Sequence, residues 1–193
     1  VKEQDEQRTC LGGTTLLMLL VSGLITLLLL VFLHPLLRLP GVEGEILRLT
    51  AEYIQVIAIG TVCQLLATGF VPFIRNMGGA TFAMSAMIAG FLTNVFLDAI
   101  FVPQWGMAGA AWATVIGQAV TMLAAVAFFL KKKATLSLPP LSAISEFFGS
   151  VSKVAVAPFG LTISPALTII LMNRFLLLYG NEQDMAAYSC ISY

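Results

Sequence analysis

The stretch that decides the fold is TFAMSAMIAGFLTNVFLDAIFV, residues 81–102, and the small-residue run GMAGAAWAT follows it at residues 106–114. A helix needs about 20 apolar residues to cross the roughly 30 Å hydrocarbon core of a membrane. This stretch also contains Asn94 and, one helical turn later, Asp98. An ionisable group at the bilayer centre costs about 2.5–3.5 kcal/mol on insertion scales, so it usually faces a partner or a water-filled cavity. Asp98 is therefore the first candidate functional residue.

The composition indicates a membrane protein. Of the 193 residues, 59% are hydrophobic and only 10% are charged, and the mean hydropathy is +0.94. A soluble domain carries about 25% charged residues. The apolar residues form five blocks, each close to the length of a membrane span, at residues 14–33, 53–74, 81–102, 108–130 and 154–178. The sequence thus predicts an all-α fold, a polytopic transmembrane helix bundle.

The distribution of positive charge predicts an orientation. If the loops alternate between the two faces, the N-terminal face holds Lys2, Arg8, Arg75, Lys131, Lys132, Lys133 and Lys153, and the other face holds Arg38, Arg48 and Arg174. Cytoplasmic loops are enriched in Lys and Arg. We therefore expect an integral, multi-pass protein of the plasma membrane (the inner membrane of a bacterial cell) with the N-terminal face and Lys131–Lys133 in the cytoplasm. We favour this topological role of the lysines over recognition of lipid headgroups.

The sequence lacks the residue patterns of enzymes and metal centres. It has one histidine, His34, expected in a loop or at the membrane interface, and it contains no nucleophile elbow, phosphate loop or paired intramembrane carboxylates. Cys10, Cys63 and Cys190 share no metal-ligand or redox spacing. The net charge of zero gives no sign of a nucleic-acid partner. We expect no enzyme, no catalytic residue and no cofactor.

Two helix faces carry the candidate site. On the first face, the small or polar residues Ala86, Gly90, Asn94 and Asp98 follow one another every four positions. On the second face, Gly109, Ala113 and Gly117 do the same, with Thr114 and Gln118 beside them. Small residues let membrane helices approach closely, and polar ones hydrogen-bond across the contact. The short connection at residues 103–107 makes the two spans antiparallel neighbours. Asn94, Asp98 and Thr114 are predicted to converge on one polar pocket, and spacing alone leaves Asp98 open as a cation or proton site or as an interfacial acid.

The motif NVFLD at residues 94–98, followed by GMAGAAWATVIGQ at residues 106–118, resembles the fifth and sixth helices of the multidrug and toxic compound extrusion (MATE) family. Further similarities lie upstream in Gly41, Glu45, AEY at residues 51–53 and RNMG at residues 75–78, and downstream in APF at residues 157–159, Asn173-Arg174, Tyr179-Gly180 and AAY at residues 186–188. Together they cover nearly the whole chain.

The resemblance implies part of a two-lobe, twelve-helix transporter. Residues 1–133 would be a partial N-terminal transmembrane lobe with four spans, helices three to six. Residues 134–153, with Pro139-Pro140, would be the cytoplasmic linker between lobes, and residues 154–193 the start of the C-terminal lobe. The beginning at Val1 and the apolar end at residues 185–193 also predict a piece of a longer protein, so the remainder of the same polypeptide is an expected partner.

The resemblance further implies secondary active efflux of small organic, often cationic, compounds by H⁺ or Na⁺ antiport. The coupling ion would bind at Asp98, Asn94 and Thr114, with no other metal, and membrane lipids would surround the bundle. Some members use a glutamate in the seventh helix, but residues 154–178 contain no Asp or Glu. The alternatives are a flippase for lipid-linked precursors or a structural membrane subunit. Met84, Met87 and Met122 are expected to serve ordinary packing or lipid contact rather than a substrate cavity.

Overall fold

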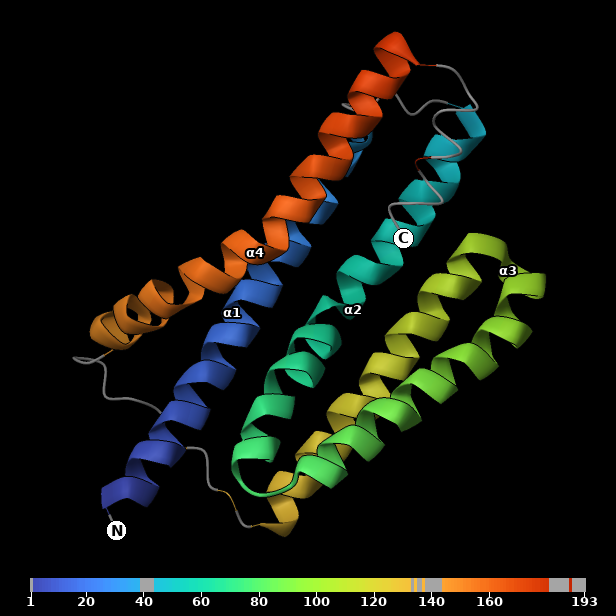
Figure 1. Cartoon of the computed structure of the whole chain (residues 1–193). Coiled ribbons are helices and arrows are strands. Elements are labelled where there is room, and N and C mark those ends of the chain that lie inside the picture. Colours follow the sequence, from blue (N-terminus) through green and yellow to red (C-terminus); the bar gives the residue numbers. More distant parts are fainter. Residues whose placement is uncertain are drawn as a thin grey trace. The chain divides into compact units, whose positions relative to one another are not determined.

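The computed structural model describes residues 2–38, 44–132, 134, 137, 144–180 and 188. These residues form the helices α1 (Lys2–Arg38), α2 (Gly44–Asn76), α3 (Ala80–Lys131) and α4 (Ile144–Tyr179), shown in Figure 1. Each of the four is long and apolar enough to cross a membrane. The prediction of an all-α fold is confirmed. The chain divides into two compact units, Val1–Pro139 and Pro140–Tyr193.

Helix α3 contains two of the five predicted spans. Its 52 residues would extend for about 78 Å if they were straight, far more than the membrane requires. At Gly106 the backbone has φ 56° and ψ −130°, a conformation outside the helical region that L side chains rarely adopt. The chain reverses there, and Figure 1 shows α3 folding back on itself. We call residues 80–105 the first limb and residues 107–131 the second limb. The sequence predicted a short connection at residues 103–107 between antiparallel spans. In the structure the chain reverses at one residue, Gly106.

Small residues let the two limbs pack with their backbones close together. Gly90 and Gly117 lie opposite each other, and a Cβ added to Gly117 would lie 2.7 Å from the Gly90 carbonyl oxygen. The Thr121 hydroxyl lies 3.4 Å from the Ala86 carbonyl oxygen and 3.3 Å from that of Gly117. The buried residues of the second limb recur every four positions as Gly109, Ala113, Gly117, Thr121 and Ala125. The predicted small-residue stripes therefore form the contact between the limbs.

Helix α2 packs against both α1 and α3. The Thr26 hydroxyl of α1 donates a hydrogen bond to the Ala58 carbonyl of α2 at 2.7 Å. On its other side, Gly60 lies directly against the Val115 side chain of α3. Inside a bilayer such close helix contacts depend on packing and interhelical hydrogen bonds, because lipid tails are as apolar as the side chains. Helix α2 thus positions the limbs of α3 relative to α1.

An apolar cluster closes the end of this unit where α2 turns into α3. It contains Leu11, Phe70, Val71, Ile74, Ala83, Ala125, Phe128 and Phe129, all buried. Gly78 has φ 79°, and the amide of Gly79 donates to the Ile74 carbonyl at 2.9 Å, so the turn is short. A Cβ at Gly79 would lie 2.7 Å from the Phe128 ring. The turn places Arg75, in the last turn of α2, next to Met87 of the first limb.

Helix α4 forms the described part of the second unit. It begins at Ile144, so residues 144–153 of the predicted linker are helical. Pro158 and Pro165 lie inside the helix, and the Thr162 hydroxyl bonds back to the Pro158 carbonyl at 2.8 Å. Lys133, Pro139-Pro140 and Cys190, as well as the side chain of His34, lie outside the described residues. The assignment of residues 134–153 to an inter-lobe linker stays a prediction.

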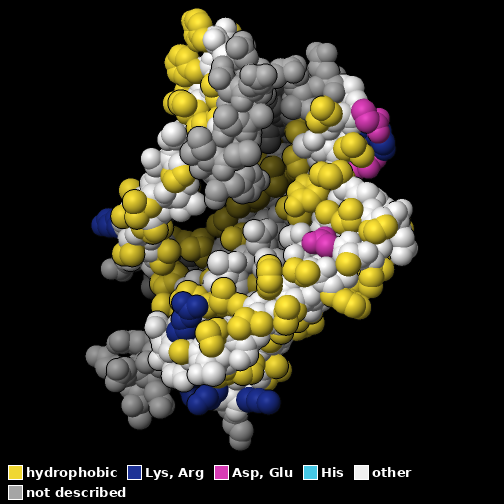
Figure 2. Space-filling view, turned by 45° about the vertical axis from the view of Figure 1, so that its right-hand side comes forward, with side chains coloured by type: hydrophobic (Ala, Val, Ile, Leu, Met, Phe, Trp, Pro, Cys, Tyr) yellow, Lys and Arg dark blue, Asp and Glu magenta, His cyan; other side chains and the backbone are white. Residues whose placement is uncertain are grey.

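The surface of the described helices is largely apolar. Large hydrophobic side chains point outward on every helix, and Leu130 is 73% exposed and Phe96 67%. Figure 2 shows hydrophobic side chains over much of the visible face, with charged ones in a few separate groups. Contiguous apolar surface of this extent is typical of a surface that contacts lipid or other helices.

Replacing Gly90 by Ala tests the packing of the two limbs. The new Cβ would meet the Thr121 hydroxyl and lie 2.6 Å from the Gly117 carbonyl oxygen, a backbone atom that cannot easily move. We expect Gly90→Ala to destabilise the fold by about 1–3 kcal/mol, the usual cost of overpacking, seen as a lower melting temperature in detergent. The matched control is Gly23→Ala, whose Cβ meets nothing within 4 Å. Equal melting temperatures for the two variants would contradict this packing.

Candidate functional site

The reversal of α3 brings two of the three predicted site residues into contact. Asn94 of the first limb donates from Nδ2 to the Thr114 hydroxyl oxygen of the second limb at 3.4 Å. The Thr114 hydroxyl itself donates to the Ala110 carbonyl at 3.0 Å, which leaves its oxygen to accept. Both side chains are half-buried. Among the described residues, no donor forms a hydrogen bond to the side-chain oxygen of Asn94, so both side chains retain acceptor capacity.

Asp98 lies one turn beyond Asn94, toward the reversal at Gly106, and is half-buried. The register sets Asn94 opposite Thr114, whereas the sequence predicted that Asn94, Asp98 and Thr114 all converge on one polar pocket. The Asp98 Oδ1 atom is buried and has no hydrogen-bond partner among the described residues. A buried acceptor without a partner loses its hydration with no compensating bond. Such a group is a candidate for binding a proton or a cation.

A pocket of about 320 Å³ opens between α2 and the two limbs of α3. Residues from all three segments line it: Ala67, Thr68 and Val71 from α2; Met87, Gly90, Phe91 and Asn94 from the first limb; and Thr114, Gly117, Gln118 and Thr121 from the second. Asn94 and Thr114 mark one end, which we call the Asn94 end, and Met87 marks the other, the Met87 end. Asp98 is not among the lining residues.

The lining combines apolar walls with neutral hydrogen-bonding groups. Thr68, Asn94, Thr114, Gln118 and Thr121 contribute hydroxyl and amide groups, and none of the described lining residues is Lys, Arg, Asp or Glu. Ligand pockets are usually apolar, with a few convergent polar groups that orient the ligand. Thr68, Met87 and Phe91 are exposed, so the pocket opens onto the surface of this unit. The arrangement suits an amphipathic organic molecule.

Sequence reasoning identified part of this lining. Gln118 belongs to the predicted polar stripe, and Thr121 continues the four-residue spacing of Gly109, Ala113 and Gly117. Met87 was expected in ordinary packing, yet it lines the pocket, whereas Met84 and Met122 do not. The residues of α2 were missed, because no pattern within residues 67–71 shows which helix they face.

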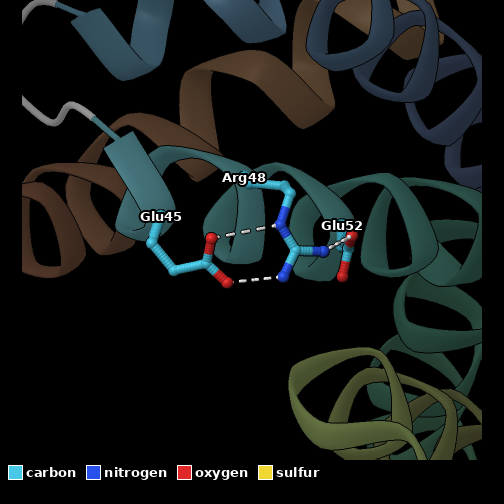
Figure 3. A network of polar contacts seen from close by, with 3 residues as sticks. All are labelled: Glu45, Arg48 and Glu52. Atoms are coloured by element: carbon cyan, nitrogen blue, oxygen red, sulfur yellow. Dashed lines mark hydrogen bonds and ion pairs between the residues drawn. The ribbon is translucent and has the colours of Figure 1, made fainter.

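Glu45 and Glu52 differ from Asp98 in having a partner. At the start of α2, Arg48 forms ion pairs with Glu45 at 2.5 Å and Glu52 at 2.6 Å, as Figure 3 shows. The side chains of Arg48 and Glu45 are 58% and 69% exposed, and such surface pairs contribute little to stability. Among the described residues, no three His, Cys, Asp or Glu side chains are grouped to hold a metal ion.

Comparison with known proteins gives consistent matches. The profile of the family described as MatE matches residues 2–100. The multidrug export protein MepA of Staphylococcus saprophyticus is 29% identical over 167 residues, which is 84% of this chain and 37% of that protein. MepA of Staphylococcus aureus is 29% identical over 149 residues, 73% of this chain and 32% of its own length.

A solved structure described as the inward-facing conformation of a multidrug resistance MATE family transporter of the MOP superfamily is also similar. The TM-score is 0.69 with 26% sequence identity, over 76% of this chain and 35% of that one. This chain therefore spans about a third of the length of the relatives that it matches.

A double-mutant cycle tests the contact between Asn94 and Thr114. We expect Asn94→Ala and Thr114→Val to be coupled by about 0.6 kcal/mol, the average for interhelical hydrogen bonds in a membrane protein, measured by unfolding in detergent. Ser85 provides the control, because its hydroxyl bonds only to the Thr81 carbonyl of its own helix at 3.0 Å. Ser85→Ala and Thr114→Val should be additive. Additivity in the Asn94–Thr114 cycle would show that the two side chains do not interact.

Proposed function

This chain belongs to the MATE family of multi-pass membrane transporters, which are not enzymes, and from that premise we propose that it forms part of an exporter of small organic, often cationic, compounds. In this proposal the inward movement of H⁺ or Na⁺ drives export. The relatives described as multidrug export proteins support it. The observation that carries it is the buried Oδ1 of Asp98, which lacks a partner among the described residues of a membrane helix.

The ion site consists of Asp98 with Asn94 and Thr114. A carboxylate at this depth is costly when charged and alone, and a proton or Na⁺ removes that cost by neutralising it. Asn94 lies one turn from Asp98 and contacts Thr114, and both side chains present oxygen atoms, the ligands that hard cations prefer. Binding of the ion thus changes the charge of the segment next to the Asn94 end of the pocket.

The pocket holds the organic substrate. Its neutral lining and apolar walls accept an amphipathic molecule. Because Asp98 lies one turn beyond Asn94, its charge acts on the Asn94 end and attracts a cationic group there when no ion is bound. Coupling then follows from competition, since the ion that neutralises Asp98 weakens the attraction for the substrate. No specific observation favours a flippase, because the lining residues that the structure describes include no basic side chain for a phosphate group.

The N-terminal face is cytoplasmic in this proposal. Arg75 ends α2, and Lys131 and Lys132 end α3, so these basic residues lie at the same end of the unit. The opposite end of α2 carries Arg48 between two carboxylates. Cytoplasmic ends of membrane helices are enriched in Lys and Arg, which favours this orientation.

Cysteine labelling in intact cells tests the orientation. Residues 104 and 132 are exposed and lie at the reversal and at the end of α3, respectively. We expect Gln104→Cys to react with a membrane-impermeant maleimide from outside. Lys132→Cys should react only after the membrane is permeabilised. The reverse pattern would show that the orientation is inverted.

Asp98→Asn tests the ion site in the complete protein that carries this chain. The substitution keeps the shape and removes the charge, so export driven by an ion gradient should be lost. The melting temperature should not fall, because Oδ1 has no hydrogen bond to lose among the described residues. Asn94→Ala removes one ligand and should reduce export less.

Glu52→Gln is the matched control, because it removes a carboxylate that is paired with Arg48 at the other end of α2. Efflux of a fluorescent dye from proteoliposomes with an imposed H⁺ or Na⁺ gradient provides the measurement. Glu52→Gln should export normally. Undiminished coupled efflux by Asp98→Asn would leave Asp98 an interfacial acid and refute the proposal.

A further inference from the structure

Arg75 continues the face of α2 that lines the pocket. Thr68 and Val71 line it, and Arg75 follows Val71 by four residues, one helical turn. The Arg75 Nη2 atom donates to the Met87 sulfur at 3.9 Å, and Met87 itself lines the pocket. The Arg75 guanidinium group therefore lies at the Met87 end of the pocket, although it is not part of the lining.

The Arg75 charge has no carboxylate partner among the described residues. The ion pairs among these residues join Arg48 to Glu45 and Glu52, far along α2 from Arg75. A thioether sulfur is only a weak hydrogen-bond acceptor, and the Arg75 side chain is exposed. A guanidinium group offers a planar set of donors that matches a carboxylate. A carboxylate that reached the Met87 end would therefore replace the sulfur as the acceptor.

The two ends of the pocket thus lie next to opposite charges. Arg75 contacts Met87 at one end, and Asp98 lies one turn beyond Asn94 at the other. Met87 and Asp98 are eleven positions apart on the first limb, about 16 Å along a helix. The described lining residues between them are all neutral. A molecule with an amine at one end and a carboxylate at the other fits this order of charges.

We propose that Arg75 is a specificity-determining residue that selects amphipathic zwitterions, with a carboxylate at the Met87 end and a cationic group toward Asp98. The inference rests on the proposed function, because it takes the pocket to be the substrate site. It extends that function by naming the substrate class and the residue that sets it. The inference concerns binding of the substrate, so it is tested separately from the coupling of export to an ion.

The test compares two dyes that differ only at the carboxylate. Rhodamine 110 carries an ionised carboxylate, and rhodamine 123 is its methyl ester. Their dissociation constants are measured by fluorescence anisotropy with the complete, purified protein in detergent. We expect rhodamine 110 to bind about tenfold more tightly, as one charge-assisted hydrogen bond at a partly exposed site would give. Arg75→Gln should abolish this preference and leave the binding of rhodamine 123 unchanged.

Three further variants separate the proposal from a general role of basic residues at the membrane interface. Arg75→Lys keeps the charge and should retain most of the preference. Lys132→Gln removes a charge at the same end of the unit, where the Lys132 ammonium lies over the Phe128 ring, and should retain all of it. Met87→Glu adds a carboxylate beside Arg75 and should abolish the preference without removing a basic residue, which decides the matter if Arg75→Gln does not fold.

Equal affinities for the two dyes in the unaltered protein, or binding of neither, would overturn the inference. An equal loss of affinity for both dyes in Arg75→Gln would also overturn it, since an interfacial anchor would act in that way. Failure of ion-driven export with the dye preference intact would instead count against the proposed coupling alone. The two proposals therefore fail by different measurements.

Discussion

The close approach of Gly90 to Gly117 is the constraint on which the rest of the structure depends. A Cβ on either residue would lie within 2.7 Å of the other's carbonyl oxygen, so any side chain there separates the two limbs of α3. Membrane helices have no hydrophobic force that draws them together, and they associate through packing and interhelical hydrogen bonds. With the limbs in contact, the Thr121 hydroxyl comes within reach of the Ala86 carbonyl, and Asn94 reaches Thr114. Both polar contacts form because Gly90 and Gly117 have no side chains that would hold the limbs apart.

The same approach creates the pocket. Gly90 and Gly117 line the pocket where the two limbs meet, and the larger side chains of Met87, Phe91 and Gln118 also line it. Helix α2 supplies the remaining wall, held in place by the packing of Gly60 on Val115. A glycine fills no volume beyond its backbone. Two facing glycines therefore bring the limbs into contact and leave an empty space beside that contact. One sequence feature thus brings the limbs together and leaves room for a ligand beside them.

The sequence predicted the helical class and the antiparallel limbs, because these depend on local periodicity and a short connection. It also predicted that Asn94, Asp98 and Thr114 converge on one polar pocket, whereas the described pocket lining includes Asn94 and Thr114 but not Asp98. Four residues turn a helix by about 400°, so a stripe with four-residue spacing drifts by about 40° at each step. Between Gly90 and Asp98 the drift is about 80°, which turns Asp98 away from the face that Gly90 presents. The contributions of α2, including the contact between Arg75 and Met87, depend on packing between helices, which no single segment encodes.

In the proposed coupling, the position of Asp98 outside the pocket lining decides how the ion and the substrate affect each other. An acid inside the pocket would contact substrate and ion at one place, and either one would exclude the other by volume. Placed one turn beyond Asn94, Asp98 acts on the pocket through its charge, and Asn94 and Thr114 lie between the two. In this proposal substrate and ion compete for the charge of Asp98 without competing for the same space. Such a coupling tolerates substrates of different shape, because it depends on where a charge lies and not on which atoms fill the pocket.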